Sequence, residues 1–145
     1  MADLAYHFYE AGAWEQALKY GQRAGEQAER LYAPHTVIEQ ATRALDASER
    51  GSIVPPASLY RLRGRGYETL GNFELAQADF KATLKMAQQA KDLNAEWQAL
   101  IDLGFLWAQR DYTQAGTYFQ QALALARHKD DPITCLLYTS PSPRD

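Results

Sequence analysis

The chain has 145 residues, of which 46% are hydrophobic, and this is enough to fill one domain with a sizeable core. A net charge of -3 gives no basic surplus, which argues against general binding to nucleic acid or to an anionic membrane. No apolar run approaches the roughly 20 residues of a membrane span, and the first residues lack the basic and apolar regions of a signal peptide. We therefore expect a cytoplasmic location.

Two helical patterns joined by a short turn open the chain. Residues 3–11 form a short amphipathic pattern, and a longer helix is predicted over about residues 14–32. Gly12 lies between them, where a glycine suits a tight turn. The first helix is expected to turn inward Leu4, Ala5 and Phe8.

Pro34 begins a third helix, because its fixed φ angle suits the first helical turn. The buried stripe of this helix is predicted to contain Val37, Ala41, Ala44 and Leu45. Residues 51–56, GSIVPP, then break the pattern, because two prolines and a glycine end one helix and cannot lie within the next. We interpret them as a loop between stacked repeats, since the helical pattern resumes at once.

A fourth and a fifth helix are predicted within residues 60–91, joined by a tight turn. Gly71 tolerates a positive φ angle there, and Asn72 can cap the helix that follows. Gly64 and Ala76 are small at the positions where the two backbones should approach. The fifth helix is expected to bury Phe73, Ala76, Phe80 and Leu84.

A sixth and a seventh helix follow the turn at residues 92–94, where Asn94 can cap the first of them. Equivalent small residues recur in three helices at steps of 39 residues, namely Val37, Ala76 and Ala115. Such equal steps indicate a structural repeat, and a repeat needs stacked neighbours to cover its apolar face. If the chain is cut after its seventh helix, Leu123 and Leu125 should lie on exposed apolar surface.

The pattern Tyr60-x2-Arg63-Gly64-x2-Tyr67…Ala76-x3-Phe80 resembles a tetratricopeptide repeat, W-x2-L-G-x2-Y…A-x3-F. It recurs as Leu100-x2-Leu103-Gly104-x2-Trp107, and in part as Leu4-Ala5-x2-Phe8…Ala17. Arg63 stands where the family has leucine, with Leu62 beside it, which leaves the facing of that turn open. The resemblance implies an all-α fold over residues 1–132. We expect a right-handed superhelix of antiparallel helix pairs, an α-solenoid with about seven helices.

The last eleven residues, CLLYTSPSPRD, do not follow the helical pattern. They are similar to the translation of a transposase-type sequencing adapter, so residues 133–145 are expected to be a non-native or disordered tail. The alternative is a natural disordered tail. On the adapter interpretation Cys135 says nothing about redox chemistry, and the natural protein continues beyond about Pro132.

No residue pattern supports catalysis, so the chain is not expected to be an enzyme or to hold a metal or cofactor. His7, His35 and His128 lack His, Cys or carboxylate partners in a pattern typical of a metal site. No phosphate-binding glycine motif is present, and no nucleophile elbow is visible.

The repeat resemblance implies a binding surface, because the first helix of each repeat in this family lines the concave face. Carried over by position, this face would bind a protein or peptide, and not nucleic acid or a membrane. An ordinary solvated face is the alternative for any one of these residues. The candidates are Arg23, Glu26, Arg61, Arg65, Glu68, Asp102, Phe105 and Gln109.

Residues 9–33, YEAGAWEQALKYGQRAGEQAERLYA, followed by IEQATRALD, resemble the helical-repeat region after the ATPase core of large bacterial signalling proteins. These include transcriptional regulators, so the resemblance implies an interaction scaffold or sensor module in signal transduction or transcription regulation. With the adapter-like tail, it suggests a metagenomic fragment. One alternative is a regulatory domain that binds a small-molecule inducer in an apolar pocket around Phe105 and Trp107. Another is a free-standing adaptor.

Overall fold

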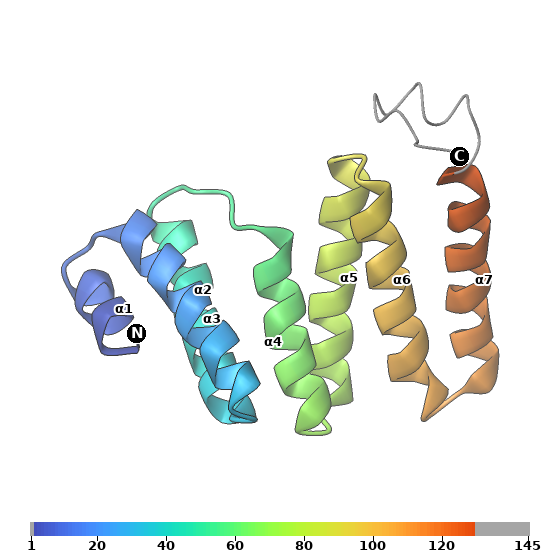
Figure 1. Cartoon of the computed structure of the whole chain (residues 1–145), viewed down its shortest axis with the longest axis horizontal. Helices are drawn as coiled ribbons and strands as arrows, with labels where there is room; N and C mark the ends of the chain where they lie inside the picture. The colour runs from blue at the N-terminus through green and yellow to red at the C-terminus, as the bar shows by residue number, and fades with distance from the viewer. Residues whose placement is uncertain (1, 130–145) are drawn as a thin grey trace. The chain divides into compact units, whose positions relative to one another are not determined.

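The computed structural model describes residues 2–129, and in that range the chain is all-helical, with seven helices and no strand (Figure 1). Helices that follow one another in the chain pack together, as α1 does on α2, α2 on α3, α3 on α4, and α6 on α7. The predicted all-α class is confirmed, whereas the predicted tail, residues 133–145, lies outside the described residues. The helices are α1 (Ala2–Glu10), α2 (Trp14–Arg30), α3 (Pro34–Arg50), α4 (Ala57–Thr69), α5 (Phe73–Gln89), α6 (Leu93–Ala108) and α7 (Tyr112–Lys129).

The turns between helices repeat one local geometry. A residue with a positive φ angle follows α1, α2, α3, α4 and α5, at positions 12, 32, 52, 71 and 91, so the turn recurs every 19 or 20 residues. The next N–H then donates to the carbonyl five residues earlier, as Ala33 does to Ala28 at 2.9 Å and Asp92 to Ala87 at 3.0 Å. This bond satisfies a carbonyl that the helix end leaves open. Gly12 and Gly71 are thus confirmed as turn residues.

Side-chain oxygens cap the N-termini of α5, α6 and α7. Asn72 accepts a hydrogen bond from the N–H of Leu75 at 3.3 Å, as predicted for α5. The prediction for α6 was wrong, because the N–H of Ala95 donates to Asp92 at 3.1 Å and Asn94 already lies inside the helix. Asp111 accepts from the N–H of Thr113 before α7 at 2.9 Å. A carboxylate or amide oxygen here satisfies N–H groups that have no partner within the helix.

The described residues divide into two compact units, one up to Asp79 and one from Phe80 onward. The core of the first unit confirms Val37, Ala41 and Ala44 as buried residues of α3, whereas Leu45 is partly buried beside them. The other members of this core come from α2 and α4, and they are Leu18, Ala28, Leu59 and Leu62.

The prediction that Leu4 faces inward was wrong, since Leu4 is 42% exposed. The nine-residue α1 has room for only a narrow contact with α2. Ala5 is buried, and the ring of Phe8 stacks on that of Tyr20 at 5.3 Å between centroids. Adjacent helical residues point about 100° apart, so Leu4 is turned away from the face that Ala5 presents.

In the second unit α6 and α7 form a helical hairpin (Figure 1). The predicted motif residues Leu100, Leu103 and Gly104 are buried on α6, and Ala115 and Ala122 are buried on α7. No helix among residues 2–129 combines the length and the apolar character needed to cross a membrane.

Candidate functional site

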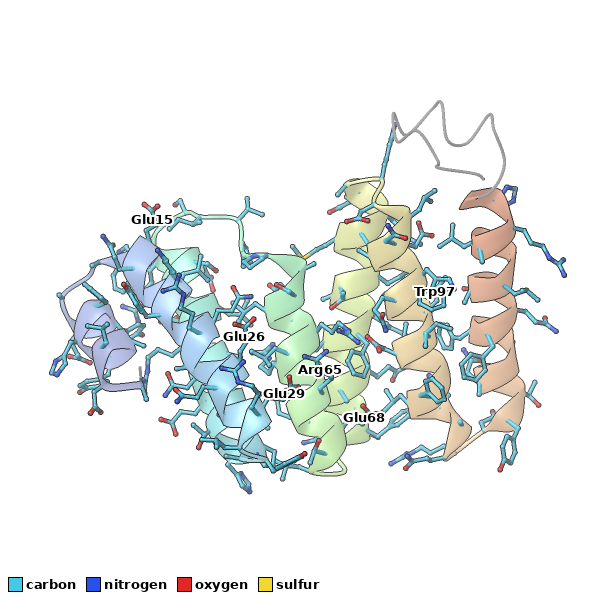
Figure 2. All side chains as sticks on the ribbon, viewed as in Figure 1. Glu15, Glu26, Glu29, Arg65, Glu68 and Trp97 are labelled. Atoms are coloured by element: carbon cyan, nitrogen blue, oxygen red, sulfur yellow. The ribbon has the colours of Figure 1, made fainter. Side chains whose placement is uncertain are left out.

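Arg65 on α4 and Glu29 on α2 form a two-point ion pair (Figure 2). Arg65 Nε donates to Glu29 Oε2 at 2.7 Å, and Nη2 donates to Oε1 at 2.9 Å. Both side chains are about one-third exposed. A guanidinium and a carboxylate paired in this way hold a fixed mutual orientation, so the pair links α4 to α2.

Two further contacts join the same two helices. Gln22 Nε2 on α2 donates to Ser58 Oγ on α4 at 3.0 Å. Gly25 lies so close to α4 that a Cβ atom there would be 2.9 Å from Leu62 Cδ2. The absence of a side chain at position 25 therefore lets the two helices approach closely.

We call the polar surface on these helices the α2–α4 face, and it contains five of the eight predicted binding residues together with Glu29. Arg23 is exposed, with its guanidinium carbon 5.4 Å from the centroid of the Tyr20 ring. Glu26 is exposed and forms no ion pair with another described residue. The face carries three positive and three negative side chains, namely Arg23, Glu26, Glu29, Arg61, Arg65 and Glu68.

The other three predicted residues lie in the second unit, with Asp102 and Phe105 on α6 and Gln109 directly after it. Asp102 accepts a hydrogen bond from Gln98 Nε2 at 3.3 Å, and Gln109 is exposed at the end of the helix. Phe105 is 61% exposed, and its ring meets the edge of Phe119 at 5.3 Å between centroids. That these three residues share a groove with the α2–α4 face stays a prediction.

Sequence reasoning missed a polar cluster around Arg63. Arg63 Nε donates to Asp79 Oδ2 and Nη2 donates to Oδ1, both at 2.8 Å, while Nη1 donates to Thr42 Oγ1 at 3.3 Å. The hydrogen bond to the buried Asp79 is the main cause that raises the pKa of Arg63. The signal in the sequence was an arginine where the tetratricopeptide pattern that the sequence resembles has leucine, because an arginine buried there needs an acidic partner.

A second cluster links α1 to α3. Tyr9 Oη donates a short hydrogen bond to Asp46 Oδ2, and Arg50 Nε donates to the same oxygen at 2.9 Å. The hydrogen bond from Tyr9 is the main cause that lowers the pKa of Asp46, and it also raises the pKa of Tyr9. The guanidinium of Arg50 lies 5.7 Å from the ring centroids of both Tyr9 and Trp14. These contacts join α1 to α3.

No group of three or more His, Cys, Asp or Glu side chains among residues 2–129 is placed to hold a metal ion. His7, His35 and His128 are all exposed.

The sequence matches no protein-family model, and comparisons with curated proteins and with solved structures found no significant match.

Proposed function

We propose that the chain is a non-enzymatic interaction module whose α2–α4 face binds a protein or peptide segment. The observation that carries this proposal is the Arg65–Glu29 pair, with bonds of 2.7 and 2.9 Å between the two helices. It holds the helices as a fixed frame, from which Arg23 and Glu26 extend into solvent. A preorganised surface loses less conformational freedom on binding, and this favours recognition of a flexible segment.

Because the α2–α4 face carries both positive and negative side chains, it suits a partner segment that carries both positive and negative charge. Arg23 and Glu26 lie three residues apart on α2, so they are neighbours on one side of the helix. An extended or helical peptide with an acidic and a basic residue can pair with both. Arg65 and Glu29 neutralise one another, so they contribute position more than attraction.

The test is a paired charge exchange on the full chain. Arg23→Glu with Glu26→Arg keeps the net charge and reverses the pattern that a partner would meet. The matched control is Glu39→Arg with Arg43→Glu, which reverses a surface pair on α3 whose bond is 3.3 Å. Partners are identified by crosslinking and mass spectrometry with the wild-type chain, and each affinity is then measured for both exchanges. The proposal expects at least about a tenfold loss for the α2 exchange alone, equivalent to about 1.4 kcal/mol. Equal affinity in all three proteins would remove this face as the binding surface.

We further propose that the module belongs to a larger bacterial signalling ATPase or transcription regulator, in which it receives a partner or signal. The support is the resemblance carried by residues 9–33 and by the nine residues from Ile38 to Asp46. Long-read sequencing of the source DNA through the codons for Met1 and Cys135 tests it. A phosphate-binding loop upstream and further repeats downstream are the expected result. A gene that ends at Asp145 would contradict the regulator proposal and leave a free-standing adaptor.

A further inference from the structure

A pocket of about 480 Å³ lies in the first unit, between the second half of α3, the loop that follows it and the start of α4. Its apolar lining comes from Leu45, Ile53 and Pro55, and Tyr60 adds an aromatic side chain. The volume is within the range of roughly 300 to 1,000 Å³ that is usual for small-ligand sites. The pocket is therefore large enough for a ligand with an apolar body.

Two donor side chains of the lining, those of Arg63 and Ser48, are already used within the protein. Arg63 directs Nε and Nη2 to Asp79 and Nη1 to Thr42, and Asp79 balances its charge. Ser48 Oγ donates to the carbonyl of Leu45 at 2.7 Å. An anion would have to compete with Asp79 for the guanidinium, so the lining does not suit a phosphate or a carboxylate.

Acceptors remain, however. Asp46 receives both of its hydrogen bonds, from Tyr9 and Arg50, at Oδ2, which leaves Oδ1 without a donor among the described residues. Glu49 also lines the pocket, and its carboxylate has no ion pair or hydrogen bond within residues 2–129. Asp46 and Glu49 lie three residues apart on α3 and so are neighbours on one helix face. Because Arg50 balances Asp46, the unbalanced charge of the pocket is the negative charge of Glu49.

We propose that this pocket binds an organic ammonium ion on an aliphatic stem, the chemistry shared by a free alkylamine and a lysine side chain. The stem packs on Leu45, Ile53 and Pro55, as lysine stems do on apolar surfaces. The ammonium group offers three donors to Glu49 and to Asp46 Oδ1.

This pocket is separate from the α2–α4 face. Tyr60 and Arg63 lie on a different side of α4 from Arg61, Arg65 and Glu68, as the helical spacing requires. The two proposals can therefore fail independently.

The test is a titration of the isotopically labelled full chain with hexylammonium chloride, followed by the NMR shifts of the backbone amides of Ser48, Glu49 and Ile53. We expect saturable shifts at these amides. Hexanol and heptanoate have the same hexyl stem without the positive charge, and we expect them to bind at least about tenfold more weakly. Equal binding of hexanol, or no saturation with hexylammonium, would overturn the proposal.

Two substitutions locate the charge. Glu49→Gln removes the unbalanced carboxylate and should weaken hexylammonium binding about threefold to tenfold. Glu49→Lys places an ammonium group of the protein beside the pocket and should abolish binding. A cation near the carboxyl end of α3 suits the helix dipole, so loss of folding is not expected. Glu39→Gln, on the same helix but outside the pocket, is the matched control and should bind as the wild type does. An unchanged affinity in Glu49→Gln would contradict the assignment.

A final titration separates the two sources of the ammonium group. Nα-acetyl-lysine N-methylamide presents the charged lysine side chain with a peptide group on each side of its α-carbon. If it binds at least as tightly as hexylammonium at the same amides, the ligand is a lysine of a protein partner. If it binds more weakly, the peptide groups are excluded and the ligand is a free amine. Shifts that fall outside the pocket with both compounds would overturn the proposal.

Discussion

Arg63 on α4 donates two parallel hydrogen bonds of 2.8 Å to Asp79 on α5. In the tetratricopeptide pattern that the sequence resembles, the position of Arg63 is a leucine. Asp79 is 4% exposed, so its charge is tolerated because the guanidinium lies beside it. The neighbouring Leu62 is buried, at 2% exposed. An ion pair thus joins these two consecutive helices, α4 and α5.

Arg63→Leu, which introduces the leucine found in the tetratricopeptide pattern, should destabilise the chain. It removes the two-point ion pair of the buried Asp79, and we expect the free energy of unfolding to fall by about 2 to 3 kcal/mol. Urea denaturation followed by circular dichroism measures this change. The control is Arg63→Leu with Asp79→Leu, which removes both charges and should recover most of the loss. If the double variant is no more stable than the single one, the pair does not act as described.

Tyr9→Phe should change the pH dependence of stability at both ends of the pH range. The Tyr9 hydrogen bond lowers the pKa of Asp46 below its ordinary value of 3.8, so its stabilisation is present above that value and is lost as the pH falls through the lower folded pKa. The raised pKa of Tyr9 has the opposite sign, so that stabilisation is present below 10.0 and is lost at more alkaline pH. NMR titration of Asp46 in both proteins provides the direct measurement, and the pKa should rise in the variant. An unchanged pKa would show that the bond does not form in solution.

Gly104→Ala should destabilise the α6–α7 hairpin. A Cβ atom at this position would lie 2.5 Å from Cε1 of the Phe119 ring, so the ring would have to move. We expect a net loss of about 1 kcal/mol, because overpacking outweighs the helix preference of alanine. Gly116→Ala on α7 is the matched control, since nothing lies within 4 Å of its Cβ position, and it should gain up to about 1 kcal/mol. Thermal unfolding measures the melting temperature of both variants. Equal shifts of the melting temperature in the same direction would contradict the prediction.

Leu123→Glu should make the protein less prone to associate without lowering its stability. Leu123 is 53% exposed on α7, as expected from the sequence, whereas Leu125 is only partly exposed. An exposed leucine adds to the apolar surface that drives self-association, and a carboxylate removes that contribution. Sedimentation velocity over a range of concentrations measures the effect, with Ala124→Glu as the matched control. A wild-type chain that remains monomeric, with a sharp and concentration-independent thermal transition, would count against the prediction.

The sequence by itself determined the helices and the turns between them. Glycines 12 and 71 marked turns because only a residue without a side chain adopts a positive φ angle freely, and both have one, at 73° and 77°. The sequence did not indicate that Tyr32, Ser52 and Lys91 would also adopt a positive φ angle, because residues with a side chain rarely do so. There the geometry of the helix end, and not the residue type, fixes the angle.

Only the tertiary structure decided which side chains meet. Helical periodicity places Arg65 on one side of α4, but its pairing with Glu29, 36 residues earlier, depends on how α4 packs on α2. The same is true of Arg63 and Asp79, and of the pocket around Glu49. Periodicity is a property of one helix, whereas a pairing, a balanced charge or a pocket depends on the distance between helices, which the packing of the whole core sets.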